Sequence, residues 1–328
     1  MESPAMLRIV FTGAFAGPFE PLVRPLIKTP CETLQADEGA VLAHLGEIDV
    51  LVTLALSAAM GKAAGSRLKL VQLPAAGLDR IDRTALPKGT LLANAYGHET
   101  GIAEYIISAM LVLARNLIRL DADLRAGIWP GPWVPGKPRL PPAAELAGKT
   151  LGILGYGHIG QALARRARAF DMEVLATRRT PSTDQDGLAD VGGPDRLDEV
   201  LRRSDYLAIT LSLNDATRGL LGARELALMK ASACLINVAR AEIVDGDALY
   251  RALAEGRLAG AALDVWYRYP QDDKPTLPAV QPFHELPNVL MTPHMSGGTE
   301  GTIQSRAALV AANIDRLARG ETLVNLVR

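Results

Sequence analysis

Short apolar runs alternate with longer stretches of helical periodicity along most of this chain. In the first hundred residues the apolar runs predict strands at residues 7–12, 49–54, 70–73 and 91–93. A second series begins at Lys149 and predicts six more strands, at residues 150–154, 173–177, 206–210, 234–238, 261–265 and 289–292. Strands that alternate with helices are typical of parallel sheets with crossover helices, and six strands complete one dinucleotide-binding sheet. The pattern therefore predicts an α/β protein.

Three other segments have patterns of their own. Residues 101–120 are helical and apolar over most of their surface, which predicts one long buried helix, and residues 301–319 predict an amphipathic helix. Residues 128–142 contain six prolines and two tryptophans, Trp129 and Trp133. Because indole side chains are costly to leave in water, we expect an ordered arm packed on another surface, such as a partner subunit. A structureless linker is the alternative.

Length and composition narrow the class of protein. A chain of 328 residues exceeds what one hydrophobic core usually holds, which predicts two domains. Lys and Arg (35) balance Asp and Glu (36), which argues against a nucleic-acid partner, and 48% hydrophobic residues argue against disorder. Two cysteines, Cys31 and Cys234, are too few for a disulfide framework or a structural zinc site. No apolar run is long enough to span a bilayer, so we expect a cytoplasmic protein without a membrane partner.

A glycine-rich loop lies between the strand predicted at 150–154 and a helical pattern. Its sequence is Gly155, Tyr156, Gly157, His158, Ile159, Gly160. In this context Gly155 permits a tight turn, Gly157 lets the backbone approach a pyrophosphate, and Gly160 lets the helix pack close to the strand. Backbone N–H groups and the positive end of the helix then hold the phosphate. The loop predicts a dinucleotide cofactor.

The end of the next strand predicts which dinucleotide is bound. An NAD site needs a carboxylate there to accept hydrogen bonds from the ribose hydroxyls. This chain has Thr177, Arg178, Arg179 and Thr180 instead, with no acid. Two guanidinium groups, with the threonine hydroxyls as further donors, suit a 2′-phosphate, because the planar fork of arginine donates two parallel hydrogen bonds. We therefore expect NADP(H) to be preferred over NAD(H).

Several ordered motifs resemble the D-isomer-specific 2-hydroxyacid dehydrogenase family over nearly the whole chain. They are LVQLPAAGLDRID at 70–82, the glycine loop at 155–160, LINVAR at 235–240, GAALDVW at 260–266 and TPH at 292–294. The resemblance implies two Rossmann-like, doubly wound parallel-sheet domains. One is a split, flavodoxin-like substrate domain of residues 1–100 and 295–328, and the other is a central NAD(P)-binding domain of residues 101–294. It also implies a homodimer and hydride transfer at C2 of a small 2-hydroxy or 2-keto acid.

The resemblance also implies roles for individual residues. Arg240 binds and polarises the keto acid, and His294 donates a proton to the forming alkoxide. The positions that match the substrate side of the site are Ala75, Ala76, Gly77, His98 and Tyr269. Besides the glycine loop and the Thr177–Thr180 segment, the positions that match the cofactor side are Ser212, Thr217, Val238, Ala239, Asp264, His294 and Ser296. No metal site is expected.

One position departs from the family pattern. Most members have a glutamate five residues after the aspartate, and it pairs with the catalytic histidine, but this chain has Tyr269 there. A carboxylate beside a histidine favours imidazolium, and losing it affects the orientation and tautomer of the ring. Three interpretations remain. Tyr269 orients His294 through its hydroxyl, or another acid takes over (Glu99, Asp272 or Glu285), or the reaction needs no proton shuttle, as in the related formate dehydrogenases.

We therefore predict an NADPH-dependent reductase of a small 2-keto acid, with glyoxylate and hydroxypyruvate as the simplest candidates. Formate enzymes carry glutamine in the Tyr269 slot and asparagine in place of His98, so oxidation of a formate-like anion ranks lower. A non-catalytic NADP(H) sensor or corepressor on the same fold is a further alternative. The presence of both Arg240 and His294 argues against that alternative, because a sensor needs neither.

Overall fold

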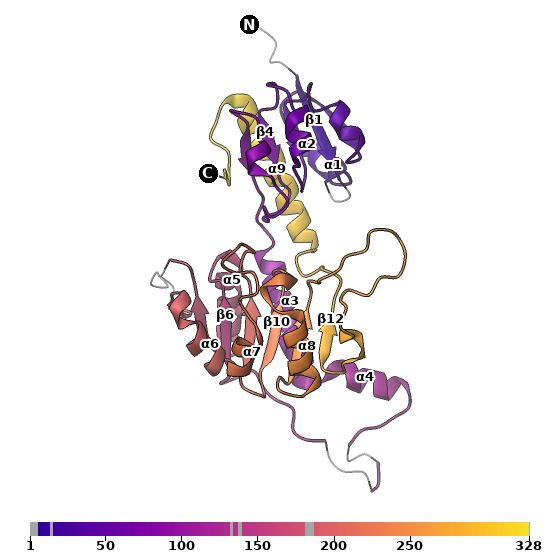
Figure 1. Cartoon of the computed structure of the whole chain (residues 1–328), viewed down its shortest axis with the longest axis vertical. Coiled ribbons are helices and arrows are strands. Elements are labelled where there is room, and N and C mark those ends of the chain that lie inside the picture. Colours follow the sequence, from indigo (N-terminus) through magenta and orange to yellow (C-terminus); the bar gives the residue numbers. More distant parts are fainter. Residues whose placement is uncertain (1–5, 14–15, 132–133, 137–139, 181–186, 328) are drawn as a thin grey trace. The chain divides into compact units, whose positions relative to one another are not determined.

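The computed structural model describes residues 6–13, 16–131, 134–136, 140–180 and 187–327 (Figure 1). The chain divides into two compact units. The first combines both ends of the chain, Met1–Gly97 and Thr299–Arg328, and the second comprises His98–Gly298. Each unit contains its own parallel sheet, which confirms the α/β class with two doubly wound sheets.

The first unit is built on a five-stranded parallel sheet with the order β2-β1-β3-β4-β5, the flavodoxin-like order. Its strands are β1 (Leu7–Thr12), β2 (Cys31–Ala36), β3 (Val50–Val52), β4 (Leu70–Gln72) and β5 (Leu91–Ala93). Its α-helices are α1 (Glu20–Val23), α2 (Ala58–Ala63) and α9 (Glu300–Arg319), and its 3-10 helices are Arg24–Leu26, Ala40–Ala43 and Arg83–Ala85. Strand β2 was not predicted because it is an edge strand with mostly polar, half-exposed residues.

Helix α9 joins the far end of the chain to this sheet (Figure 1, yellow beside indigo). Its apolar face, which includes Val310 and Ile314, packs in one core with Phe11 and Val52 of strands β1 and β3. After α9 the chain continues to β5, where Leu326 forms an antiparallel bridge with Ala93. The C-terminal residues are therefore part of the first unit's core and sheet.

The second unit is built on a seven-stranded parallel sheet with the order β12-β11-β10-β9-β6-β7-β8. Its strands are β6 (Thr150–Leu154), β7 (Glu173–Thr177), β8 (Asp190–Gly192), β9 (Tyr206–Ile209), β10 (Cys234–Asn237), β11 (Gly260–Leu263) and β12 (Val289–Met291). Its helices are α3 (Glu99–Arg115), α4 (Leu117–Arg125), α5 (His158–Ala169), α6 (Leu197–Arg203), α7 (Ala223–Leu228) and α8 (Gly246–Ala254), with 3-10 helices at Pro194–Arg196, Ala241–Ile243 and Phe283–Glu285. The strand order reverses at β6, and in such sheets ligands bind at the carboxyl ends of the strands beside this point.

The long helix predicted at residues 101–120 is two helices. α3 ends at Asn116, whose φ of 50° is left-handed, and α4 follows at an angle of 60°. Asparagine is one of the few residues that adopt this conformation readily, so it ends the helix although the apolar pattern continues. The prediction of burial holds for α3, but α4 has no buried residue. In the described part of the chain no single helix is long and apolar enough to cross a membrane, and α3 and α4 pass that test only as a bent pair.

The proline-rich segment at 128–142 is described in part. Trp129 is 56% exposed in the single chain, and Trp133 lies outside the described residues. The predicted packing of this arm on a partner subunit stays a prediction.

Candidate active site

The glycine loop connects β6 to α5, and two of its glycines are required by their surroundings. Gly155 has a φ of 104°, and a Cβ there would lie 2.9 Å from backbone atoms of Thr210 and Leu211. A Cβ on Gly160, in the first turn of α5, would lie 2.8 Å from the carbonyl oxygen of Gly155. The loop therefore turns tightly and holds the helix close against the sheet, as the motif predicts.

Gly157 differs from the other two glycines because a Cβ there would meet nothing within 4 Å. The residue is exposed, its backbone is extended, and it precedes the N-terminus of α5. His158 is exposed beside it, whereas the Tyr156 side chain is buried in the core of the unit. The open space in front of Gly157 and the helix end fits the close approach of a pyrophosphate.

In the segment at the end of β7 the first threonine is buried, whereas the arginines are at least partly exposed. The carbonyl of Thr177 accepts hydrogen bonds from the N–H groups of Gly155 and Tyr156, and its side chain is buried. Arg178 is half-buried, and its N–H donates to the carbonyl of Gly192 in β8. Arg179 and Thr180 are exposed. The described turn thus offers two guanidinium groups and no carboxylate.

The second predicted cofactor loop is held by its own hydrogen bonds. The Thr217 hydroxyl donates to the carbonyl of Ser212 at 2.8 Å and accepts from the N–H of Asn214 at 2.9 Å. These bonds fix the shape of the loop that follows β9.

Arg240 lies on a turn after β10 that is held by a buried amide. The side chain of Asn237 is 2% exposed; its Nδ2 donates to the carbonyl of Arg240 at 2.9 Å, and its Oδ1 accepts from the N–H of Ala239 at 3.0 Å. Val238 and Ala239 are buried, and Arg240 Nη1 donates to the Ala239 carbonyl. Sequence reasoning missed Asn237, although a polar residue that ends an apolar strand before Arg240 was a usable signal.

His294 lies on a turn that is held by a buried carboxylate. Asp264, which is fully buried, accepts hydrogen bonds from the Thr292 hydroxyl at 2.6 Å and from the N–H groups of Met295 at 2.8 Å and Ser296 at 2.9 Å. His294 has a φ of 56°, which is unusual for a residue other than glycine. The three bonds of Asp264 hold the residues on both sides of His294 and so hold this backbone conformation in place.

Tyr105 of α3 extends this network and was not predicted. Its hydroxyl lies 2.6 Å from the Thr292 hydroxyl. Burial raises the pKa of Tyr105 to about 12, the hydrogen bond with Thr292 lowers it, and the charge of Asp264 raises it further. Tyr105 is therefore a neutral hydroxyl that helps to fix Thr292.

Tyr269 contacts the His294 ring directly. Its hydroxyl lies 2.8 Å from His294 Nδ1 and accepts a hydrogen bond from the N–H of Trp266 at 3.3 Å. Burial raises the pKa of Tyr269, while the Trp266 N–H and the charge of Arg240 oppose this. Arg240 follows β10, Tyr269 follows β11 and His294 follows β12, and these three strands are neighbours in one parallel sheet. Arg240, Tyr269 and His294 therefore gather beyond the carboxyl ends of β10, β11 and β12.

The other candidate partners of His294 have different surroundings. Asp272 pairs with Lys274, and Glu285 lies 3.8 Å from His284. Glu99 lies in the first turn of α3. His98 precedes that helix, is 9% exposed, and lies beside Gly297.

The loop at Ala75–Gly77 belongs to the first unit and follows β4. The carbonyl of Ala75 accepts from the N–H of Ala95, and the carbonyl of Ala76 accepts from the Asn94 side chain. The N–H groups of Ala75, Ala76 and Gly77 have no acceptor among the described residues. Such N–H groups are donors for which a bound anion is a suitable acceptor.

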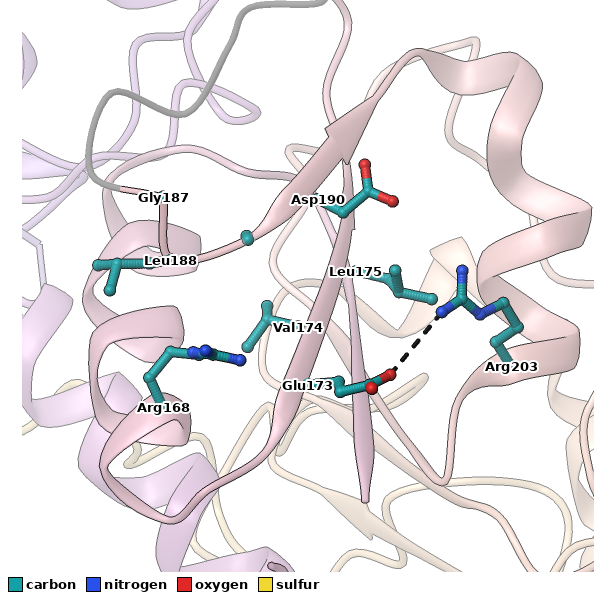
Figure 2. Close-up of a pocket in the computed structure, with 9 residues that line it drawn as sticks. Arg168, Glu173, Val174, Leu175, Gly187, Leu188, Asp190 and Arg203 are labelled. Atoms are coloured by element: carbon teal, nitrogen blue, oxygen red, sulfur yellow. Dashed lines mark ion pairs between the residues drawn. The ribbon is translucent and has the colours of Figure 1, made fainter. Parts of the chain in front are cut away.

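A hollow of about 270 Å³ lies on the edge of the second sheet, on β7 and β8 (Figure 2). Its lining residues are Arg168, Glu173, Val174, Leu175, Gly187, Leu188, Ala189, Asp190 and Arg203. Glu173 pairs with Arg203 across it, and Arg168 donates to the carbonyl of Met172. None of the predicted site residues lines this hollow. Among the described residues no group of three or more His, Cys, Asp or Glu is placed to hold a metal ion.

Comparison with known proteins shows to which family the chain is similar. Residues 107–296 match the family described as D-isomer specific 2-hydroxyacid dehydrogenase, NAD binding domain. The glyoxylate reductase of Thermococcus gammatolerans is 35% identical over 90% of this chain and 88% of its own length. The D-3-phosphoglycerate dehydrogenase of Methanocaldococcus jannaschii is 34% identical over 80% of this chain and 48% of its own.

Solved structures show the same fold. A 2-hydroxyacid dehydrogenase from Ketogulonicigenium vulgare matches with a TM-score of 0.80 and 28% identity, over 100% of this chain and 99% of the other. An acyclic imino acid reductase in complex with NADPH and D-Arg matches with a TM-score of 0.81 at 22% identity, over 98% and 100%. The fold and the glycine loop thus define an NAD(P)-dependent oxidoreductase. More narrowly, the chain belongs to the D-isomer specific 2-hydroxyacid dehydrogenase family, which confirms the resemblance found in the sequence.

The contrast between two glycines tests the cofactor loop. Gly157→Ala should leave the stability of the dinucleotide-free protein within about 1 kcal/mol, because its Cβ meets open space, yet weaken dinucleotide binding at least tenfold. Gly160→Ala should lower stability by about 1–3 kcal/mol, because its Cβ presses on the Gly155 carbonyl. Urea unfolding and a fluorescence titration with NADPH measure the two effects. Unchanged binding by Gly157→Ala would show that the pyrophosphate lies elsewhere.

Proposed function

We propose that this protein reduces a small 2-keto acid, such as glyoxylate or hydroxypyruvate, to the D-2-hydroxy acid with NADPH. The observation that carries the proposal is the placement of Arg240, Tyr269 and His294 after three neighbouring parallel strands, with Tyr269 and His294 in contact. An arginine and a histidine there suit a substrate with a carboxylate and a carbonyl. The similarity to glyoxylate reductases over about nine-tenths of the chain supports this substrate class.

Arg240 holds and polarises the substrate in this proposal. Its planar guanidinium donates two parallel hydrogen bonds to a carboxylate and stabilises negative charge on the carbonyl oxygen as it forms. One N–H already donates to the carbonyl of Ala239, and Asn237 holds the turn, so the orientation of the group is set before the substrate binds. Less of the interaction is then lost in ordering the side chain.

His294 supplies the proton to the developing alkoxide. Because Nδ1 faces Tyr269, Nε2 is the nitrogen that serves the substrate oxygen. Asp264 holds the turn that carries the ring, so we assign Asp264 a positioning role. In the first unit we assign binding of a substrate carboxylate to the N–H groups of Ala75, Ala76 and Gly77. A fixed N–H array of this kind favours a small anion over a neutral compound.

The cofactor is held by the glycine loop and by the turn after β7, and when bound it supplies the hydride. The loop presents Gly157 and the end of α5 to the pyrophosphate. We assign the 2′-phosphate to Arg178 and Arg179, with Thr180 as a further donor, because Thr177–Thr180, directly at and after the end of β7, contain no carboxylate. The buried side chain of Thr177 leaves its hydroxyl a smaller part in this contact.

A parallel screen tests substrate class and cofactor together. With glyoxylate and hydroxypyruvate, kcat/KM with NADPH should exceed that with NADH at least tenfold, and the double variant Arg178→Ala/Arg179→Ala should remove most of the preference by raising the KM for NADPH. Oxidation of each cofactor at 340 nm gives both ratios. Equal or NADH-favouring values in the wild type would contradict the cofactor assignment, and no oxidation with any 2-keto acid would favour a sensor.

Removal of Arg240 tests the catalytic assignment. Arg240→Ala should lower kcat/KM for the keto acid about a hundredfold or more, about 2.7 kcal/mol, because the carboxylate and the carbonyl lose their common partner. Arg257→Ala is the matched control, since that exposed arginine pairs with Glu255 at the amino end of β11. Steady-state kinetics at saturating NADPH measure the loss. A loss smaller than tenfold would show that another residue holds the substrate.

We also propose that the protein is a homodimer formed through α4 and the segment after it. Exposed apolar side chains gather there: Leu117, Ile118, Leu124, Ile128 and Trp129 are 47–56% exposed. Covering them with the same surface of a second copy would remove a large apolar area from water.

Charge placed on this surface tests the dimer. Ile118→Glu/Leu124→Glu should convert a dimer to a monomer without unfolding it, because α4 has no buried residue in the single chain. Sedimentation velocity at micromolar concentration measures the state. A wild-type monomer, or a variant that remains a dimer, would contradict this interface.

A further inference from the structure

The Tyr269 hydroxyl has two partners in the described part of the chain. The N–H of Trp266 donates to its oxygen at 3.3 Å, and Nδ1 of His294 lies 2.8 Å away. The N–H bond occupies one of the two lone pairs on the oxygen. One lone pair and the hydroxyl proton are left for the imidazole, and a hydroxyl can use either of them, whereas a carboxylate can only accept.

We propose that Tyr269 is the positioning partner of His294, and that its hydroxyl donates to Nδ1 of the neutral ring and accepts from Nδ1–H of the charged ring. This deepens the proposed function, because it rests on His294 as the group that moves the proton. Donation to Nδ1 places the proton of the resting neutral ring on Nε2. When the charged ring gives its Nε2 proton to the alkoxide, the remaining proton is on Nδ1, and the hydroxyl accepts from it. A carboxylate can only accept, so it would hold the neutral ring in the Nδ1–H tautomer alone and would also stabilise the charged ring.

The surrounding structure holds this pair rigidly. The indole N–H of Trp266 donates to the carbonyl of Thr292 at 2.8 Å, and the same carbonyl accepts from the N–H of His294 at 3.1 Å. Trp266 therefore holds the hydroxyl through its backbone and the histidine turn through its side chain. Trp266 thus connects the Tyr269 hydroxyl to the turn that carries the His294 ring.

Charged and titratable groups also lie on the elements around this pair. Arg240, in the turn after β10, and Glu242, in the 3-10 helix that follows, act on the hydroxyl with opposite signs. The buried carboxylate of Asp264 is bound by Thr292, Met295 and Ser296. His98, directly before α3, lies beside Gly297, and Glu99 is in the first turn of α3. The structure thus places a neutral hydroxyl at the ring nitrogen.

The test compares pH profiles of keto-acid reduction in variants of the full chain. Tyr269→Glu supplies the carboxylate, so the limb at which kcat/KM falls with rising pH should move up by about one pH unit or more. Tyr269→Phe removes the hydroxyl and should lower kcat at least threefold while KM for NADPH stays within twofold. Tyr267→Phe is the control, because that hydroxyl donates to the carbonyl of Val244 at 2.8 Å, and it should change neither quantity. An unmoved limb in Tyr269→Glu, or a smaller fall in Tyr269→Phe, overturns the proposal.

A second measurement does not depend on turnover. Protein labelled with 15N-histidine contains five histidines, and His294→Gln identifies the ring signals of His294. At a pH where the ring is neutral, Nδ1 should have the shift of an unprotonated nitrogen, and Tyr269→Phe should shift Nδ1 towards the average of the two tautomers. A protonated Nδ1 in the wild type, or no change in Tyr269→Phe, overturns the proposal. If no keto acid is reduced, this experiment still decides the role of Tyr269, so the two failures are distinguishable.

Discussion

The buried carboxylate of Asp264 is the interaction on which the rest of the candidate site depends. It is fully enclosed and binds three donors from a segment about thirty residues further along the chain. Burial of a charge is costly unless it is hydrogen-bonded, so the carboxylate is stable only while the Thr292–Ser296 turn is in place. The hydrogen bonds of Asp264 to this segment also hold His294 in its left-handed backbone conformation. The turn after β12 and the buried carboxylate after β11 therefore stabilise each other.

A second turn, after the neighbouring strand β10, is also held by a buried polar side chain, but this one is neutral. Asn237 uses both ends of its amide to hold the turn that carries Arg240. In both cases a buried polar side chain at the end of a strand fixes the backbone, and the residue that we assign to the substrate is more exposed. Rigid support beneath an exposed group keeps its orientation without limiting access to it.

Much of the fold was predictable because parallel strands are buried on both faces and appear as apolar runs. That signal failed for β2 and β8, which are edge strands with polar residues. The helical pattern of residues 101–120 likewise continued beyond Asn116, whose backbone conformation ends α3. The glycine loop was predictable because its three glycines lie within six residues, directly between an apolar run and a helical pattern. The network around Asp264 was not predictable from the pattern, because the tertiary fold brings Thr292 to Asp264 and Tyr105 to Thr292.

The two ends of the chain share one core, and this has a consequence for synthesis. The sheet of the first unit needs Val310 and Ile314 of α9 to cover one face, whereas the second unit is continuous in sequence. A ribosome makes the strands of the first unit before it makes α9. The sheet of the first unit therefore has an uncovered apolar face until α9 is made. The sheet that is made first is therefore completed only when α9, near the end of the chain, packs on it.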